Sequence, residues 1–281
     1  MPTTRRTRLS AQESPSAPSS SAVATPASSP TCKTRTKRTA KQQNGDTKPR
    51  KRARKTVEPD ETHQVSCLPD AARLPLADAE VFYVPAFVGE ETAKEWYEQL
   101  LELPHWYRPT LRVYGKDVTQ SRKIAAFATD PSLTVKYSGH PVQMNYDPPP
   151  LLKEIWKVVE EKLEVQFNHC MLNLYEDGKV YIGNHRDNKE NRVIASLSLG
   201  ATRTFTLTHV SPPSQAPSSP PPLSPSSPPA PALQYKWTSP LPSGSLIVMQ
   251  GRTQERWKHQ IPKEAKVKEG RVSLTFRQLV F

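Results

Sequence analysis

The 281-residue chain has only three cysteines, Cys32, Cys67 and Cys170, and no two of them form a CxxC pair. This scarcity argues against a disulfide framework and a thiolate zinc site, and it suits a reducing compartment. No stretch approaches 18 consecutive apolar residues, so we expect no membrane span. The N-terminal residues also lack the apolar segment of a secretory signal.

Aromatic residues are missing and aliphatic residues are few in the first 62 positions, which are rich in Ser, Thr, Pro, Lys and Arg. Such a segment cannot bury enough apolar surface to offset chain entropy, so residues 1–62 are predicted to be a disordered tail. Residues 1–60 carry a net charge of +10, whereas the rest of the chain carries only +2. This imbalance favours a nucleic-acid partner, and the basic cluster at residues 48–55 favours the nucleus over a mitochondrial transit peptide.

A second low-complexity stretch, residues 211–232, contains 10 Pro and 7 Ser and no charged residue. Its composition is that of a linker, with at most local polyproline II structure. Because strand-like runs flank it on both sides, it is predicted to be a long disordered surface loop. Residues 63–281 are therefore expected to form one domain.

The rest of the chain changes from helical to strand-like patterns. Helices are predicted over residues 90–103, where acids crowd the first turn, and 149–164, where apolar residues recur at helical spacing. Short alternating runs suggest a mainly β fold, a double-stranded β-helix of the jelly-roll or cupin kind with supporting helices. The strand candidates are residues 165–175, 194–199, 204–207, 245–249 and 271–280.

Three possible metal ligands occur in the strand-rich half. His185 and Asp187 are two positions apart, so on an extended strand they would share one face, and His259 follows much later. Two imidazoles and one carboxylate make the facial triad that holds non-haem Fe(II) and leaves coordination positions open. Each signal is weak alone, since an HxD pair also suits a surface turn and a single histidine is more often structural.

The last strand candidate alternates strictly between polar and apolar residues. Arg271, Ser273, Thr275 and Arg277 share one face, opposite a largely apolar one. Two inward-facing arginines need anionic partners, and a dicarboxylate supplies two negative charges.

Taken in order, these motifs resemble the AlkB family of Fe(II)/2-oxoglutarate dioxygenases. The likeness lies in His185-x-Asp187, in His259 and in the segment from Arg271 to Arg277, where Ser273 replaces an asparagine of the family pattern. It covers roughly residues 80–281 without the Pro/Ser insert, and it implies Fe(II), 2-oxoglutarate and O2 as cofactors. The metal ligands implied are His185, Asp187 and His259. The residues implied to bind 2-oxoglutarate are Asn173, Tyr175, Arg271, Ser273, Thr275 and Arg277.

Within that family the chain is most similar to the eukaryotic member that repairs duplex DNA. Val113-Tyr114-Gly115 resembles that member's hydrophobic finger, whose inserted aromatic fills the gap left by an extruded base. The basic pair Arg122-Lys123 matches as well, and Tyr137-Ser138-Gly139 resembles a segment that lines the base pocket. The resemblance implies a nucleotide-recognition lid within residues 80–164, a β core over 165–281, a duplex-DNA partner and a monomer.

The chain departs from the family just after the HxD motif. The family generally has acids there, able to contact a cationic base, whereas this chain has Asn188, Lys189 and Glu190. A lysine facing a cationic base would be repelled in a desolvated pocket. Either Lys189 points outward and Glu190 takes the acid's place, or the substrate differs; Asn188 and Glu190 are the candidate base contacts.

The resemblance implies a nuclear oxidative demethylase that removes N-alkyl lesions, 1-methyladenine and 3-methylcytosine, from DNA. It would release formaldehyde, succinate and CO2. An RNA or nucleotide demethylase on the same scaffold is the alternative that Lys189 leaves open. A catalytically inactive nucleic-acid-binding module is a third reading, against which the complete ligand set argues.

Overall fold

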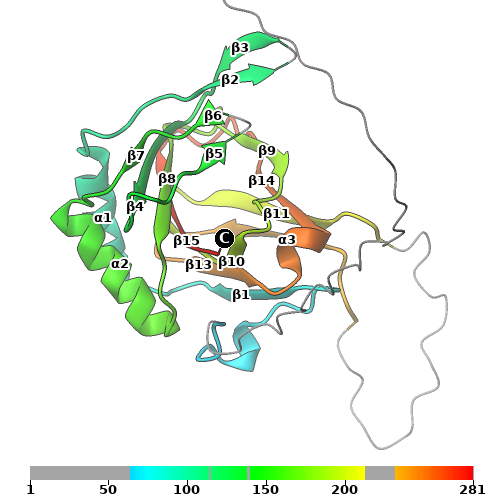
Figure 1. Ribbon diagram of the computed structural model, residues 1–281. Helices are drawn as coiled ribbons and strands as arrows, with labels where there is room; N and C mark the ends of the chain where they lie inside the picture. The colour runs from blue at the N-terminus through cyan, green and yellow to red at the C-terminus, as the bar shows by residue number, and fades with distance from the viewer. Residues whose placement is uncertain (1–63, 114, 138–139, 213–231, 281) are drawn as a thin grey trace, which may run out of the picture. The chain divides into compact units, whose positions relative to one another are not determined.

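A computed structural model of the protein describes residues 64–113, 115–137, 140–212 and 232–280 (Figure 1). The predicted tail at 1–62, Tyr114, Ser138 and most of the 211–232 loop lie outside the described residues. The described residues belong to one unit, which extends from Val57 to Phe281.

The larger of two β-sheets has seven strands in the order β1-β13-β10-β15-β8-β4-β7. All neighbours in it are antiparallel except β4 and β7, which pair in parallel. Its strands are β1 (Glu80–Val84), β13 (Leu246–Gln250), β10 (Asn191–Gly200), β15 (Arg271–Leu279), β8 (His169–Tyr175), β4 (Lys123–Ala128) and β7 (Met144–Asn145).

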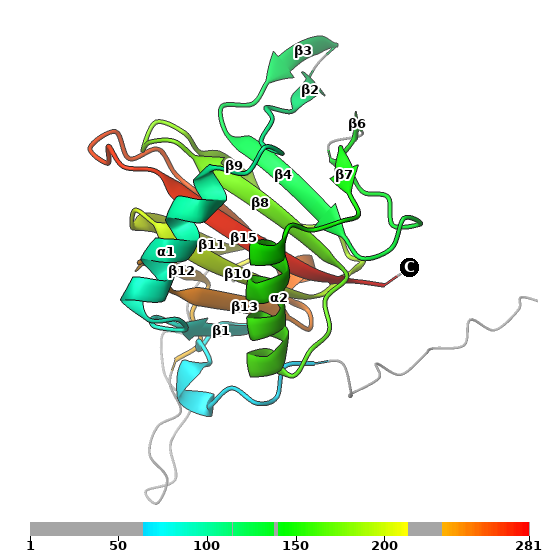
Figure 2. The same ribbon diagram turned by 90° about the vertical axis from the view of Figure 1, so that its left-hand side faces the viewer.

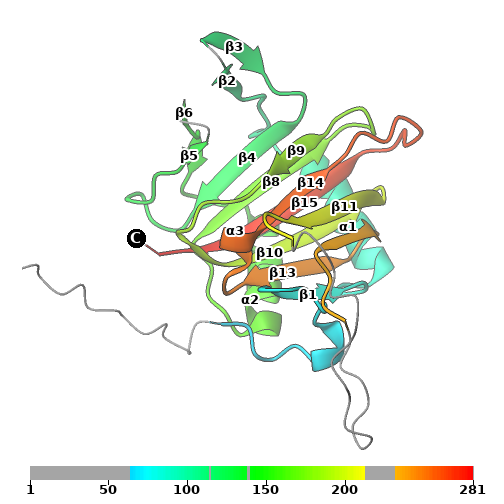
Figure 3. The same ribbon diagram turned by 90° about the vertical axis from the view of Figure 1, so that its right-hand side faces the viewer.

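The smaller sheet has four strands in the order β12-β11-β14-β9, and Figure 3 gives the view onto β9, β14 and β11. Side chains from both sheets line one cavity between them. Two antiparallel sheets around a shared interior make the mainly β, jelly-roll core that the sequence predicts. Its strands are β12 (Lys236–Leu241), β11 (Arg203–His209), β14 (Trp257–Ile261) and β9 (Ile182–His185).

Two helices, α1 (Glu90–Leu101) and α2 (Pro150–Leu163), cover the outer face of the larger sheet (Figure 2). Each buries one apolar stripe, with Trp96 and Leu100 on α1 and Ile155 on α2. These residues join the outward-facing side chains of β8 and β15 in a single hydrophobic cluster. Because this face of the sheet is sealed, polar side chains on the same strands are left to face the other sheet.

Two small hairpins extend from the region between α1 and α2. The hairpin of β2 (Thr110–Val113) and β3 (Lys116–Thr119) projects beyond the larger sheet in all three views (Figures 1–3). The backbone N–H of Arg112 donates to His140 Nε2 at 3.1 Å, which links this hairpin to the second one. The remaining elements are β5 (Lys136–Tyr137), β6 (His140–Pro141), the 3-10 helix η2 (Asp70–Ala72) and α3 (Thr253–Arg256).

Both predicted helices are confirmed to within two residues at each end. The five strand candidates correspond to β8, β10, β11, β13 and β15. The two small hairpins and strands β1, β4, β7, β9, β12 and β14 were not predicted as elements. None of the described helices is long and apolar enough to span a membrane.

Candidate active site

The polar face of β15 lines a cavity of about 360 Å³ between the two sheets. Arg271, Ser273, Thr275 and Arg277 all face this cavity, and the apolar residues between them pack into the core under the helices. The predicted alternation of β15 is therefore confirmed. The neighbouring strand β8 also turns alternate residues toward the cavity. Tyr175 of β8 pairs with Arg271, and Asn173 pairs with Ser273.

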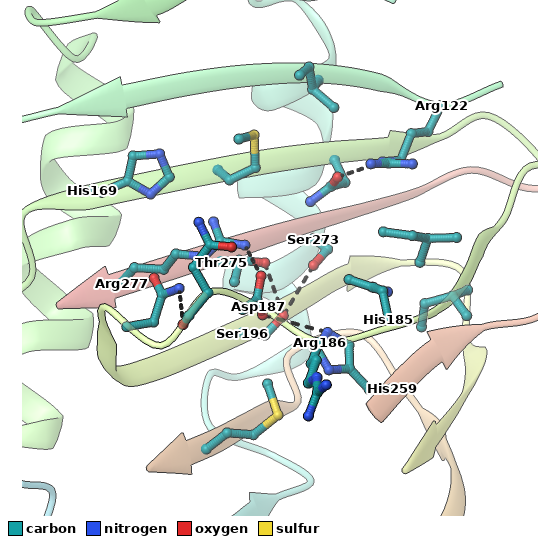
Figure 4. A pocket seen from close by; sticks show the side chains of 18 of the residues that line it. Arg122, His169, His185, Arg186, Asp187, Ser196, His259, Ser273, Thr275 and Arg277 are labelled. Atoms are coloured by element: carbon teal, nitrogen blue, oxygen red, sulfur yellow. Dashed lines mark hydrogen bonds and ion pairs between the residues drawn. The ribbon is translucent and has the colours of Figure 1, made fainter. Parts of the chain in front are cut away.

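The HxD pair meets His259 at one wall of this cavity (Figure 4). His185 is the last residue of β9 and pairs with His259 on β14, and the two ring centroids are 4.3 Å apart. The expectation that His185 and Asp187 share a strand face is wrong, because β9 ends at His185. Asp187 reaches the same place from the following loop, where its Oδ2 lies 3.6 Å from His259 Nε2.

The two oxygens of Asp187 have different neighbours. Oδ1 accepts a hydrogen bond from Arg277 Nη2 at 3.0 Å, and Oδ2 faces His259. Burial raises the pKa of Asp187, but the charge and hydrogen bond of Arg277, together with the two nearby imidazoles, outweigh burial and lower that pKa to about 2. The carboxylate is therefore ionised at neutral pH, with one oxygen fixed and one directed at the histidines.

Both histidines at this wall are held neutral. Burial, with the neighbouring His185, lowers the pKa of His259 to about 4. Burial also lowers the pKa of His185, although Asp187 partly opposes the shift. His185 Nδ1 lies 2.8 Å from the carbonyl oxygen of Gly183, so its protonation on Nδ1 leaves Nε2 as the free lone pair.

The donor set fits a divalent iron, since two neutral imidazoles and one carboxylate are the ligands of the facial triad. Among the described residues, however, no set of three His, Cys, Asp or Glu side chains already has metal-binding spacing. Asp187 Oδ2 and His259 Nε2, 3.6 Å apart, would hold the metal together with His185.

Arg271 is a buried cation, and two of its nitrogens donate no hydrogen bond to a described residue. Its side chain is 1% exposed, and its Nη2 donates to Ser198 Oγ at 2.8 Å. Its Nε and Nη1 have no hydrogen-bond partner among the described residues, and its guanidinium lies 5.3 Å from the centre of the Tyr175 ring. Burial lowers the pKa of Arg271, a cost that a bound carboxylate would relieve. The residues present thus fit a dicarboxylate at this end of the cavity.

Arg122 and Lys123, adjacent in sequence, lie in different surroundings. Arg122 is 4% exposed, lines the cavity and donates from Nε to Asn173 Oδ1 at 3.0 Å. Lys123 forms an ion pair with Glu176 at 2.9 Å, in which Arg108 also takes part. Arg122 is placed to act inside the cavity, whereas Lys123 anchors the start of β4.

Of Asn188, Lys189 and Glu190, the three residues that directly follow Asp187, only Asn188 lines the main cavity. Lys189 and Glu190 are exposed and line an adjoining depression together with α3. The structure therefore does not bring Glu190 to the position that the sequence interpretation gave it. Of the other predicted substrate contacts, Val113 is in β2 and Tyr137 in β5, and Gly115 turns the first hairpin with a φ of 79°. Tyr114 and Ser138 lie outside the described residues.

Several residues that line the cavity were not predicted from the sequence, among them Ser196, Phe205 and His169. Ser196 bonds to Ser273 at 3.1 Å, Phe205 stacks on the His259 ring at 5.5 Å, and His169 lies opposite Arg277. The signal for His169 was available, since counting back in twos from Tyr175 along β8 reaches it on the same strand face. Ser196 and Phe205 gave no signal beyond strand alternation.

The chain is similar to several known proteins. Residues 80–277 match the model of the 2OG-Fe(II) oxygenase superfamily. DNA oxidative demethylase ALKBH2 of Arabidopsis thaliana is 30% identical over 71% of this chain and 66% of its own length. Human alpha-ketoglutarate-dependent dioxygenase alkB homolog 3 is 31% identical over 72% of this chain and 67% of its own. The solved structure of OsALKBH1, 17% identical, aligns with a TM-score of 0.46 over 70% of this chain and 97% of its own.

The fold and the cavity define an oxygenase that works with Fe(II) and 2-oxoglutarate. The chain belongs to the 2OG-Fe(II) oxygenase superfamily, and within it to the AlkB family. Fe(II), 2-oxoglutarate and O2 are accordingly its cofactors.

Proposed function

We propose that the protein is a DNA oxidative demethylase that removes the N-methyl groups of 1-methyladenine and 3-methylcytosine. The observation that carries the proposal is the single cavity that joins His185, Asp187 and His259 to the buried Arg271. Relatives with about 30% identity that are named DNA oxidative demethylase support DNA as the substrate. The products would be formaldehyde, succinate, CO2 and the unmodified base.

We assign the metal to His185, Asp187 and His259. The distal carboxylate of 2-oxoglutarate is assigned to Arg271, whose Nε and Nη1 are unused. Fe(II) with 2-oxoglutarate and O2 supplies the oxidant that hydroxylates the N-methyl carbon, after which formaldehyde leaves. The other residues assigned to 2-oxoglutarate are Asn173, Tyr175, Ser273 and Thr275. Arg277, which the family resemblance also implied, is bonded to Asp187 and is assigned instead to the end of the cavity that holds the metal and the substrate.

The protein's own side chains orient and desolvate the reactants. Arg277 holds one oxygen of Asp187 by its 3.0 Å hydrogen bond and so fixes which oxygen faces the metal. The 22° stacking of Phe205 on His259 restrains the imidazole plane. Because Arg271 and Asp187 are buried, charged groups of the cosubstrate interact with them in a medium of low polarity.

The projecting β2–β3 hairpin supports a nucleic-acid partner. Arg112 and Lys116 are exposed on it, next to the finger segment whose Tyr114 would insert into the duplex. We propose duplex DNA as the partner and a monomer as the working unit. We further assign residues 63–281 to the catalytic domain, and residues 1–62 to a basic tail that holds the enzyme on DNA and directs it to the nucleus.

The test is formaldehyde release from oligonucleotides with one 3-methylcytosine or one 1-methyladenine, offered as duplex DNA, single-stranded DNA and RNA. The wild-type enzyme should act on the duplexes, and His259→Ala should lose turnover by at least about a thousandfold because a metal ligand is gone. Lys258→Ala, the preceding residue of β14 and no part of the cavity lining, is the matched control and should keep full activity. Turnover of RNA alone would replace the DNA proposal with the RNA alternative.

A further inference from the structure

His169, the first residue of β8, has no role in the site as assigned so far. Its side chain is 0% exposed and lines the cavity. Neither of its ring nitrogens has a hydrogen-bond partner among the described residues. A buried imidazole that no protein group satisfies is available to bond a polar group that enters the cavity.

The position of His169 separates it from the cosubstrate. It pairs with Arg277 across β8 and β15, whereas Tyr175 pairs with Arg271 at the other end. Six residues of extended strand span about 20 Å. A cosubstrate held between Arg271 and the metal therefore leaves the end near His169 and Arg277 for the substrate.

Two further unsatisfied atoms occur at this end of the cavity. Arg277 Nη1 lacks a hydrogen-bond partner among the described residues, although Nη2 of the same side chain is bonded to Asp187. Asn191 Oδ1 is likewise unpartnered, and Asn191 pairs with Leu279 just beyond Arg277 on β15. His169, Arg277 and Asn191 thus offer both donors and an acceptor to one incoming polar group.

The imidazole of His169 carries no charge in this setting. Burial and the neighbouring Arg277 lower its pKa to about 3, while Asp187 opposes this only in part. A neutral imidazole presents one N–H donor and one acceptor nitrogen. It can therefore bond a carbonyl oxygen next to a methylated ring nitrogen without repelling a cationic ring.

The two proposed lesions differ on the edge beside the methylated nitrogen. In 3-methylcytosine that nitrogen is flanked by a carbonyl and an amino group, whereas in 1-methyladenine it is flanked by a C–H and an amino group. Since the N-methyl carbon must lie at the metal, the flanking atoms lie next to it. Asp187 is bonded to Arg277, and Arg277 pairs with His169, so His169 is placed near one flank.

We propose that His169 determines specificity, by donating a hydrogen bond to the ring carbonyl that 3-methylcytosine has and 1-methyladenine lacks. The inference rests on the proposed demethylase function and adds a preference for the pyrimidine lesion. Arg277 and Asn191 complete the polar end wall.

The activity test compares His169→Phe, which keeps a ring but removes both nitrogens, with His169→Gln, which keeps an N–H donor. His169→Phe should lower kcat/KM on the 3-methylcytosine duplex about tenfold, equivalent to about 1.4 kcal/mol, and leave the 1-methyladenine duplex within about twofold. His169→Gln should recover part of the loss. Equal losses on both duplexes, or no loss on either, would overturn the inference.

A binding readout separates this inference from the proposed function. In the full-length protein with Zn(II) and 2-oxoglutarate, the His169 ring signals are assigned by their absence from the NMR spectrum of His169→Gln. They should shift with the 3-methylcytosine oligonucleotide and stay in place with the 1-methyladenine one. An unchanged signal with both lesions refutes the specificity role even if the enzyme is active. If the wild type releases no formaldehyde from either lesion, the demethylase proposal fails, and the ring shift alone decides the role of His169.

Discussion

At the residue scale, burial and neighbouring charges set the protonation states of the cavity side chains at neutral pH. Burial lowers the pKa values of His169 and His259 and keeps both imidazoles neutral, and Arg277 keeps Asp187 ionised. The proposed metal ligands are therefore in their binding forms before any metal arrives. This makes the dependence of metal affinity on pH a direct check of the site.

Fe(II) affinity should be almost independent of pH between pH 6 and 8. Histidine ligands with ordinary pKa values would still be losing protons there, and affinity would rise with pH. His259, with its pKa lowered to about 4, is already neutral above about pH 5, and His185 is shifted in the same direction. Anaerobic titration calorimetry at several pH values measures this. A rise of about threefold per histidine ligand between pH 6 and 7, as expected for an ordinary pKa of about 6.5, would contradict the lowered values.

Arg271 should control the affinity for 2-oxoglutarate. Replacing it with Gln keeps a hydrogen-bonding group but removes the buried charge that pairs with the distal carboxylate. KM for 2-oxoglutarate should rise about 100-fold, equivalent to about 2.7 kcal/mol, with a smaller effect on kcat. Steady-state kinetics with varied 2-oxoglutarate and a saturating 3-methylcytosine duplex measures this KM. Arg192→Gln is the matched control, because Arg192 is on β10 and does not line the cavity. Arg203→Gln is unsuitable as a control, because Arg203 supports the fold.

Single residues also show where sequence reasoning succeeds. The face of β15 could be predicted because polar and apolar residues alternate without interruption from Arg271 to Arg277. The positions of Asp187 and Glu190 could not, since β9 stops at His185 and the direction of the loop depends on contacts far along the chain. Arg122 was grouped with Lys123 because the pair resembles a basic segment of the family, although Arg122, just before β4, lines the cavity and Lys123 pairs with Glu176.

At the element scale, the turn after β8 is joined to the loop before β15. The Gly178 N–H donates to the Val267 carbonyl at 3.0 Å, and the Glu264 N–H donates to the Gly178 carbonyl at 2.7 Å. The fully buried guanidinium of Arg203 completes the junction. It donates to Glu264 and to the carbonyls of Asp177, Val180 and Pro262. This junction sets where β8 ends and β15 begins, and hence the pairing of Tyr175 with Arg271.

Gly178→Ala should disrupt that junction. An added Cβ would lie 1.9 Å from the carbonyl oxygen of Glu264, so backbone must move. A loss of about 2 to 3 kcal/mol in the free energy of unfolding is expected, which lowers Tm by about 5 to 10 °C. Gly183→Ala is the control, because a Cβ there meets nothing within 4 Å. Differential scanning calorimetry compares the two, and equal Tm values would show that the turn relaxes freely.

Some of the strands that sequence patterns missed pair with partners far along the chain. Strands β9 and β14 are four and five residues long and gain stability from each other across 74 positions of chain, from His185 to His259. Local propensity carries little information about such pairings. The helices α1 and α2 were predicted because their apolar stripes and first turns lie within one short window.

At the scale of the whole molecule, charge is divided between two parts of the chain. Residues 1–60 carry a net +10 and the remainder only +2. If the proposed tail holds the enzyme on DNA, most of its non-specific affinity comes from that segment, while the choice of lesion comes from the cavity. The two contributions can be separated, because only phosphate contacts release counterions and depend steeply on salt.

Replacing the six Lys and Arg residues of the cluster at 48–55 with Gln should reduce the dependence of DNA affinity on salt. Each phosphate contact contributes about −0.9 to the slope of log K against log salt, so up to about five units of slope should disappear. Fluorescence anisotropy with an unmodified duplex at several salt concentrations measures the slope. A variant with the uncharged residues 15–22 replaced by Gln is the control and should keep the wild-type slope. Turnover of 2-oxoglutarate at saturating substrate should be unchanged in both variants, since neither alters a described residue of the cavity. If the basic-cluster variant kept the wild-type slope, the non-specific DNA binding would have to be assigned to the catalytic domain. The exposed Arg112 and Lys116 of the hairpin would then be the candidate phosphate contacts.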